Sequence, residues 1–274
     1  MIHRKAILCL LLAGLAGGCS IPLKEAKLQY ARAQEFSRRY QTESAVAAYK
    51  RALVEAELAA RRNPSAQAFM LKGLAEVRLE RWAEAGESFR RAFAFGFESG
   101  EEWASDASLL GLGYSFEMLG LRDSAGEAYL HILKKSRFRP VLTAAAQKHV
   151  DLVLSHALGL DDKERGRVLA VLLKDVGRLL DIDYACGFFH YLSSQVLSHV
   201  AEYRRSYEEA VMARELGLPS FEILRDNDNQ IVYCWDKIES ALSPSERNAF
   251  VSTHDTLTEK WGWKDARTPG WKER

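Results

Sequence analysis

The chain has 274 residues and a formal net charge of +1, and 47% of its residues are apolar and 27% charged. This composition is ordinary for a folded protein and excludes a chain that is mostly disordered. Basic and acidic residues are nearly balanced, so the composition does not suggest the basic face that nucleic-acid binding requires, and we expect no nucleic-acid binding.

Residues 1–18 are predicted to be a signal peptide. The positive stretch His3–Lys5 precedes a ten-residue apolar run, Ala6–Leu15, which is too short to span a bilayer. Leu15-Ala-Gly-Gly-Cys19-Ser20 follows and resembles a bacterial lipobox. That resemblance implies that Cys19 is acylated, palmitate being the usual fatty acid, and becomes the mature N-terminus. An ordinary secretory peptide with a chance Cys is the alternative.

The lipobox resemblance also predicts a location. Acyl chains hold an otherwise soluble protein on a membrane, and no later segment is apolar enough to span one. Ser20 rather than Asp follows the Cys, which in two-membrane bacteria favours the outer membrane. We therefore expect a lipid-anchored protein of the bacterial cell envelope, on the outer membrane and facing the periplasm.

Three copies of a helical hairpin are predicted over residues 19–139. The third copy, 108–133, has apolar and small residues at three- and four-residue steps on both sides of a break at 120–123. The same residue types recur upstream with a period of 40 residues: Ala33, Gly73 and Gly113; Ala45, Ala85 and Ala125; Tyr49, Phe89 and Tyr129. A fixed period of this kind indicates an array of repeats.

These spacings, with Thr42-Glu-Ser-Ala45 or Trp82-Ala-Glu-Ala85 after the turn, are similar to those of the tetratricopeptide repeat (TPR) family. The period is longer than the family's usual value of about 34 residues. Arg32, Lys72 and Glu76 also occupy positions that the family keeps apolar. The resemblance implies an all-α fold, a right-handed superhelical solenoid of antiparallel helical hairpins, with longer helices or linkers than usual.

In chain order, helices are predicted over 23–40, 42–62, 65–80 and 82–95, followed by the third hairpin. Residues 140–219 are interpreted as degenerate TPR-like repeats, with Asp161 or Asp162 capping one helix and another over 184–203. Residues 220–274 are predicted to supply capping helices over 220–242 and 244–261. The tail from Trp263 either lies on these helices or forms a flexible end.

The resemblance implies that the first helix of each hairpin lines a groove for a partner protein. Exposed aromatic and Met side chains give contact area, and Arg gives directional hydrogen bonds. Carrying over the groove positions of the family gives twelve residues: Lys27, Tyr30, Gln34, Arg38, Met70, Leu74, Val77, Arg78, Leu110, Tyr114, Glu117 and Met118.

Cys186 and Cys234 remain once Cys9 leaves with the signal peptide and Cys19 is acylated. The periplasm permits disulfides, so this pair is a candidate bridge, and two buried free thiols are the alternative. Cys186 and His190 are four residues apart and share a helical face, and His199 and Cys234 would complete a metal set. Zinc signatures usually show close Cys or His pairs, which are missing, so we expect no metal and no cofactor.

No nucleophile, acid–base pair or phosphate-binding loop is apparent, so we expect a protein that is not an enzyme. The favoured hypothesis is an envelope scaffold or adaptor that binds a protein partner through the TPR groove. The complex would serve in secretion, pilus formation, polysaccharide export or outer-membrane assembly. Two alternatives stay open: a glycan or small-molecule binding protein, and an enzyme or metal-binding protein that uses the C-terminal half.

Overall fold

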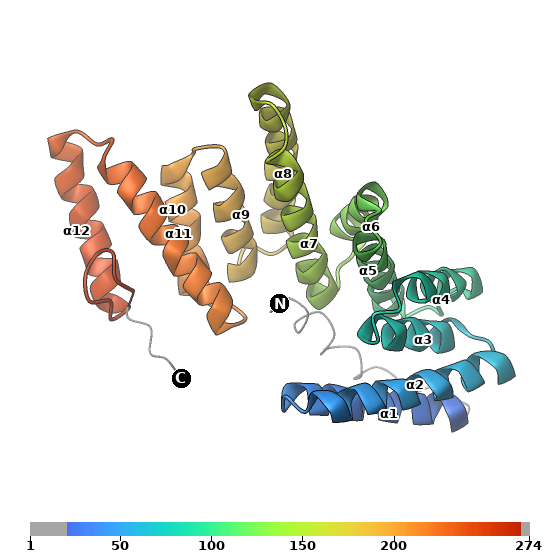
Figure 1. Cartoon of the computed structure of the whole chain (residues 1–274). Helices are drawn as coiled ribbons and strands as arrows, with labels where there is room; N and C mark the ends of the chain where they lie inside the picture. The colour runs from blue at the N-terminus through green and yellow to red at the C-terminus, as the bar shows by residue number, and fades with distance from the viewer. Residues whose placement is uncertain (1–20, 270–274) are drawn as a thin grey trace. The chain divides into compact units, whose positions relative to one another are not determined.

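The computed structural model describes residues 21–269, which are mainly helical (Figure 1). The predicted signal peptide and Cys19 lie outside the described residues. Within them the β-structure is one isolated bridge, Asp265–Thr268, so the all-α prediction is confirmed. The helices are α1 (Ile21–Arg38), α2 (Thr42–Arg62), α3 (Ala66–Arg78), α4 (Trp82–Phe95), α5 (Glu102–Met118), α6 (Arg122–Lys135), α7 (Arg139–Ala157), α8 (Asp162–Ile182), α9 (Gly187–His199), α10 (Tyr203–Leu216), α11 (Phe221–Glu239) and α12 (Pro244–Lys260).

The chain divides into two compact units, and the division falls inside α7, between His149 and Val150. The first unit contains α1 to α6 and most of α7. The second contains the end of α7, then α8 to α12 and the C-terminal segment. The sequence-based boundary at residue 139 coincides instead with the start of α7.

The first unit contains three helical hairpins, α1–α2, α3–α4 and α5–α6, followed by most of α7. Each turn contains one residue in the left-handed region: Tyr40 (φ 59°), Glu80 (φ 61°) and Gly120 (φ 77°). These three residues lie 40 positions apart, so the backbone has the same period as the sequence. Ala201 (φ 60°) occupies the corresponding turn between α9 and α10 in the second unit.

Glycines in the first helices of the hairpins make room for aromatic side chains from the second helices. A methyl group on Gly73 of α3 would lie 2.9 Å from Cε1 of Phe89, and one on Gly111 of α5 would lie 2.6 Å from Cε2 of the same ring. Phe89 of α4 therefore fills a space that both glycines leave open, and it joins the second hairpin to the third. Gly113 makes the same allowance for Tyr129.

A polar pair with a separation of 12 residues bridges the two helices of each hairpin in the first unit. The Ser37 and Tyr49 hydroxyls are 3.5 Å apart, Ser88 donates to Glu76 at 2.6 Å, and Tyr129 donates to Glu117 at 2.7 Å. In the second unit Ser206 donates to the backbone carbonyl of Ser194, again 12 residues away, at 2.6 Å. Each of these four hairpins thus has a hydrogen bond across its interior between residues 12 positions apart.

Helix starts follow local side-chain chemistry. Ser65, Asp161 and Ser220 each accept a hydrogen bond from the backbone three residues ahead, and Ser243 forms a capping box with Glu246. Asp161 is therefore the N-cap of α8. The N-cap of α2 is Gln41, so the helix begins at Thr42, the start predicted from the sequence.

Helix α9 is shorter than the 184–203 predicted, because its start is set by close packing against the end of α10. A methyl group on Gly187 would lie 2.7 Å from the backbone oxygen of Ala213. Only glycine permits this approach. The residues before it, Asp183–Cys186, form a turn that joins α8 to α9.

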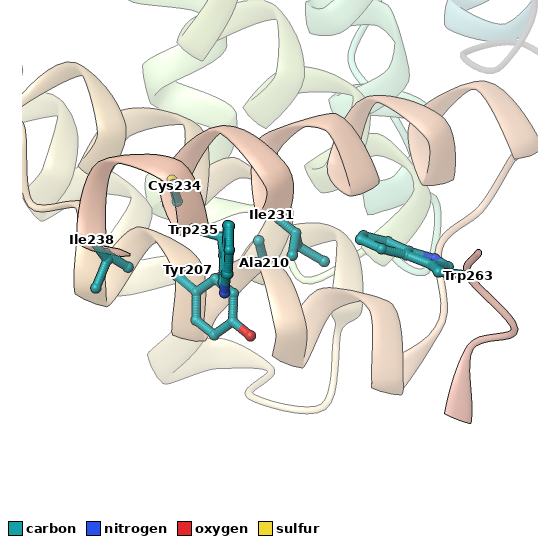
Figure 2. Packing of buried hydrophobic residues seen from close by; sticks show 7 residues of the cluster. All are labelled: Tyr207, Ala210, Ile231, Cys234, Trp235, Ile238 and Trp263. Atoms are coloured by element: carbon teal, nitrogen blue, oxygen red, sulfur yellow. The ribbon is translucent and has the colours of Figure 1, made fainter. Parts of the chain in front are cut away.

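In the second unit, α10, α11 and the C-terminal segment share an apolar cluster: Tyr207, Ala210, Ile231, Cys234, Trp235, Ile238 and Trp263 (Figure 2). Trp263 comes from the segment after α12 and is only 8% exposed. His254 of α12 stacks on the Trp235 ring at 4.8 Å and contacts the backbone oxygen of Ala266 through Nε2 at 2.8 Å.

Ionic contacts also hold this segment. Arg267 donates to Asp236 at 2.8 Å, and its guanidinium lies 5.0 Å from the centre of the Trp235 ring. Trp261 Nε1 donates to Glu215 of α10 at 2.7 Å. Of the two alternatives for the tail, the structure shows residues 261–269 lying on the last helices.

Candidate interaction surface

The twelve predicted groove residues divide into a buried and an accessible set. Six are buried in the first unit: Tyr30, Gln34, Met70, Leu74, Val77 and Leu110. Their burial places them in the packing between helices and not on an accessible surface. The other six reach the surface at least in part: Lys27, Arg38, Arg78, Tyr114, Glu117 and Met118.

The burial of half this set follows from how the first helices pack. Helix α3 contacts α2 of the preceding hairpin, its own partner α4, and the first helices α1 and α5 on either side. Several faces of α3 are therefore covered at once, which explains why Met70, Leu74 and Val77 are inside. Groove positions taken from a repeat of about 34 residues do not transfer in register to helices spaced 40 residues apart.

Lys27 takes part in a polar chain that crosses all three hairpins. Its ammonium group donates to Gln67 Oε1 at 3.1 Å, and Gln67 Nε2 donates to Glu101 at the start of α5. The Lys27–Gln67 separation is 40 residues, one full period. This side of the first helices is thus occupied by contacts between repeats.

Tyr114 is held from two sides. Trp82, the first residue of α4, packs edge-on against the Tyr114 ring with 5.6 Å between ring centres. The ammonium group of Lys148 on α7 lies 4.8 Å from the centre of the same ring, within cation–π distance. The aromatic side chain is therefore fixed in place before any partner arrives.

Glu117 connects this arrangement to the hairpin interior. Its Oε1 accepts from Lys148 at 2.9 Å, and its Oε2 accepts from the Tyr129 hydroxyl at 2.7 Å. Burial is the main cause that raises the pKa of Tyr129, and the Glu117 charge adds to it. The phenol therefore stays protonated and remains a hydrogen-bond donor to Glu117.

Large apolar side chains are exposed around the C-terminal end of α5, the helix that carries Tyr114. Met118 is one helical turn further along α5 and is 36% exposed, and the following turn exposes Leu119 (45%) and Leu121 (50%). We call Trp82, Tyr114, Met118, Leu119 and Leu121 the Tyr114 surface. Exposed apolar side chains grouped in this way mark interaction sites in soluble domains.

Three residues that contact predicted groove residues were not themselves predicted: Gln67, which contacts Lys27, and Trp82 and Lys148, which contact Tyr114. Gln67 was detectable, because it lies one period after Lys27. Trp82 was assigned only to the turn motif, and Lys148 lies beyond the three predicted repeats. No local sequence signal links either residue to Tyr114, 32 and 34 positions away.

The second hairpin contains a buried charge pair. Glu76 is 2% exposed and accepts from Lys72 at 2.9 Å and from Ser88 at 2.6 Å, and Lys72 also donates to Ser88 at 3.2 Å. Lys72 and Ser88 line a pocket of about 330 Å³ with residues of α4. Lys72, Glu76 and Ser88 thus form one hydrogen-bonded network, which explains how Lys72 and Glu76 fit at positions that the TPR family keeps apolar.

In the second unit the residues of the alternative metal site do not assemble. Cys186 and Cys234 are both buried free thiols, so the structure has no bridge between them. Cys234 contacts Ser206 Oγ at 3.1 Å and Gln230 at 3.2 Å, and burial raises the pKa of its thiol. Among residues 21–269, no three His, Cys, Asp or Glu side chains are grouped to hold a metal ion.

His190 is buried between two acceptors. Its Nδ1 lies 2.7 Å from a Glu209 carboxylate oxygen, and its Nε2 lies 2.7 Å from the backbone oxygen of Tyr184. Both ring nitrogens face oxygen atoms, so an imidazole that carries both protons can donate to both. Burial opposes this charge, but the bonds to Glu209 and Tyr184 prevail and raise the pKa of His190.

No family model matches the sequence, and no curated protein matches it. Solved structures do match the fold. That of Pseudomonas aeruginosa pilF superimposes with a TM-score of 0.53 over 87% of this chain and 94% of that one, at 11% identity. The chain has a TPR-like helical solenoid fold. At this identity the likeness concerns the fold alone.

Two further solved structures are less similar. One is the TPR2AB domain of yeast Sti1 in complex with pHSP90, with a TM-score of 0.36 and 13% identity over 87% of this chain and 93% of that one. The other is Acl4, an assembly chaperone of RpL4, with a TM-score of 0.43 and 12% identity over 88% and 92%. Among the described helices of the present chain, none is both long and apolar enough to cross a membrane.

Proposed function

We propose that this protein is a lipid-anchored scaffold of the bacterial envelope that binds a protein partner through the Tyr114 surface. The stacked hairpins of the first unit present several helices side by side, which suits recognition of another protein. The complex would belong to secretion, pilus, polysaccharide-export or outer-membrane assembly machinery. Identification of a captured partner would decide among these.

The observation that carries this proposal is the exposure of Met118, Leu119 and Leu121 around the end of the helix that holds the braced Tyr114 ring. Trp82 and Lys148 fix Tyr114, so little side-chain entropy is lost when a partner packs against it. Aromatic anchors surrounded by apolar contacts account for much of the binding energy in protein interfaces.

Photo-crosslinking in cells that produce the protein tests the partner. A photo-reactive amino acid at Met118 reports on the Tyr114 surface, and one at Val54, which is 54% exposed on α2, is the matched control. We expect one protein adduct from position 118 that position 54 does not give. Equal adducts at both positions, or none at either, would count against the proposal.

The lipid anchor rests on the signal peptide and the sequence around Cys19. Replacing Cys19 by Ala removes the only thiol at the expected processing site. Without the acyl chains the protein should move from the membrane fraction to the soluble fraction. Mass spectrometry of the native N-terminus should find a lipid-modified Cys19, and an unmodified thiol there would refute the anchor.

A further inference from the structure

The turn between α6 and α7 lies in a stretch without acidic residues. From Ala128 to His149 the chain has no Asp or Glu but has five basic residues: Lys134, Lys135, Arg137, Arg139 and Lys148. The described part of the first unit has 20 Lys and Arg against 16 Asp and Glu, a formal charge of +4. Much of this surplus is therefore concentrated at one turn.

Three of these cations have no ionic partner within the described residues. Lys148 is engaged by Glu117, and Arg139 is also engaged. Lys134, Lys135 and Arg137 are exposed, and no carboxylate of the described part pairs with them. We call these three the α6–α7 basic cluster. By contrast, Arg90 and Arg91 on α4 both pair with Glu87, at 3.3 and 3.1 Å.

The backbone that displays the basic cluster is held in place. The Ser136 amide donates to the Ile132 oxygen at 2.9 Å, and the Ser136 hydroxyl accepts from the Phe138 amide at 3.1 Å. The Phe138 ring packs against Trp103 of α5 with 6.3 Å between ring centres. Binding at this turn would thus require ordering of side chains but little ordering of the backbone.

The helix dipole accounts for only part of the basic cluster. Lys134 and Lys135 are in the last turn of α6, where cations favour the helix dipole. Arg137 lies outside both helices, so the dipole does not explain it. Three adjacent unpaired cations on a fixed turn attract carboxylates from another molecule.

We propose that the α6–α7 basic cluster binds an acidic segment, rich in Asp and Glu, of a protein partner. This proposal rests on the scaffold function and specifies further that one segment of the partner is acidic. Carboxylates of that segment pair with Lys134, Lys135 and Arg137, and the exposed location makes the interaction weaken with salt.

Fluorescence anisotropy of the purified full-length protein, with a short labelled Asp/Glu peptide as the probe, tests this proposal. The variant Lys134→Glu, Lys135→Glu, Arg137→Glu should bind the peptide about tenfold more weakly than the native protein. Lys50→Glu, Arg51→Glu, Arg61→Glu is the matched control, since it makes the same charge change at exposed residues of α2. It should bind nearly as well as the native protein.

Other outcomes would overturn the proposal. Equal loss in both variants would show that the peptide responds only to net charge. Binding to phosphatidylglycerol vesicles without binding to the peptide would assign the cluster to an anionic lipid surface. A third outcome combines two results: the peptide does not bind, and the Met118 adduct forms equally in the native protein and in the cluster variant. In that case the acidic-segment proposal fails and the scaffold function stands. If the native protein itself forms no adduct at Met118, the scaffold function is refuted.

Discussion

The hydroxyl of Tyr129 donates a 2.7 Å hydrogen bond to Glu117, and the other oxygen of Glu117 binds Lys148 at 2.9 Å. One carboxylate therefore ties together the two helices of the third hairpin and the following helix α7. The same residue lies one helical turn from Tyr114, so the stability of this junction and the shape of the Tyr114 surface are linked.

Glu117→Gln should destabilise the protein by about 2 kcal/mol, because the amide cannot balance the charge of the mostly buried Lys148. The hydrogen bond to Tyr129 can remain. Urea unfolding measures the effect, and a double-mutant cycle with Lys148→Met isolates the pair. An additive cycle would show that the two charges do not stabilise each other.

Gly111→Ala should destabilise the protein by about 1–3 kcal/mol, because the new methyl group meets the Phe89 ring at 2.6 Å. Gly166→Ala on α8 is the control, since nothing lies within 4 Å of that site, and it should be neutral or slightly stabilising. Thermal unfolding compares the two. Phe89→Leu should partly rescue Gly111→Ala, and a failure to rescue would mean that the clash lies elsewhere.

Lys72→Leu alone should cost about 3 kcal/mol, because it leaves the buried Glu76 without its counter-charge. One period later the corresponding residues are Leu112, Phe116 and Ala128. The triple variant Lys72→Leu, Glu76→Phe, Ser88→Ala copies that apolar set and should be at least as stable as the native protein. A triple variant as unstable as Lys72→Leu would contradict this view of the network.

The His190–Glu209 pair predicts a loss of stability at alkaline pH. The pKa of His190 is raised in the folded state, so its contribution is complete below the unfolded value of about 6.5 and disappears as pH rises through the folded pKa. Unfolding midpoints of native protein and Glu209→Gln, measured from about pH 6 to about pH 9, should converge as pH rises. A difference that is constant with pH would exclude a charged His190.

Trp263→Ala should destabilise the second unit by about 3–4 kcal/mol, because it removes a buried ring from the cluster formed with Tyr207 and Trp235. Hydrogen exchange should become faster in α12, because His254 of this helix contacts both Trp235 of α11 and the C-terminal segment. Lys264→Ala, at an exposed neighbour, is the control. Unchanged exchange in α12 would show that the segment does not hold it.

Local and periodic features of the fold were predictable from sequence. The bounds of α2 and α4 agree with prediction, and Ala85, Phe89 and Tyr129 are fully buried as the 40-residue period implies. These results depend on contacts within a hairpin or between neighbouring repeats, which the period encodes.

The accessible surface was less predictable. Tyr30 and Leu74 are buried in the packing between helices, whereas Met118 is exposed near the end of α5. Which side chain remains exposed depends on how closely consecutive hairpins approach, and that distance is set by Gly73, Gly111 and Phe89 together. The course of the C-terminal segment likewise depends on contacts with α10 and α11 that no local sequence pattern predicts.

The most direct test of the scaffold function is in-cell photo-crosslinking at Met118 in native protein and in a Leu121→Glu variant. Leu121 is half exposed, so the charge should leave folding intact while placing a carboxylate within the apolar contact. We predict a single protein adduct from the native chain and its loss in the variant. An adduct that persists unchanged in Leu121→Glu, or the absence of any adduct, would contradict partner binding at the Tyr114 surface.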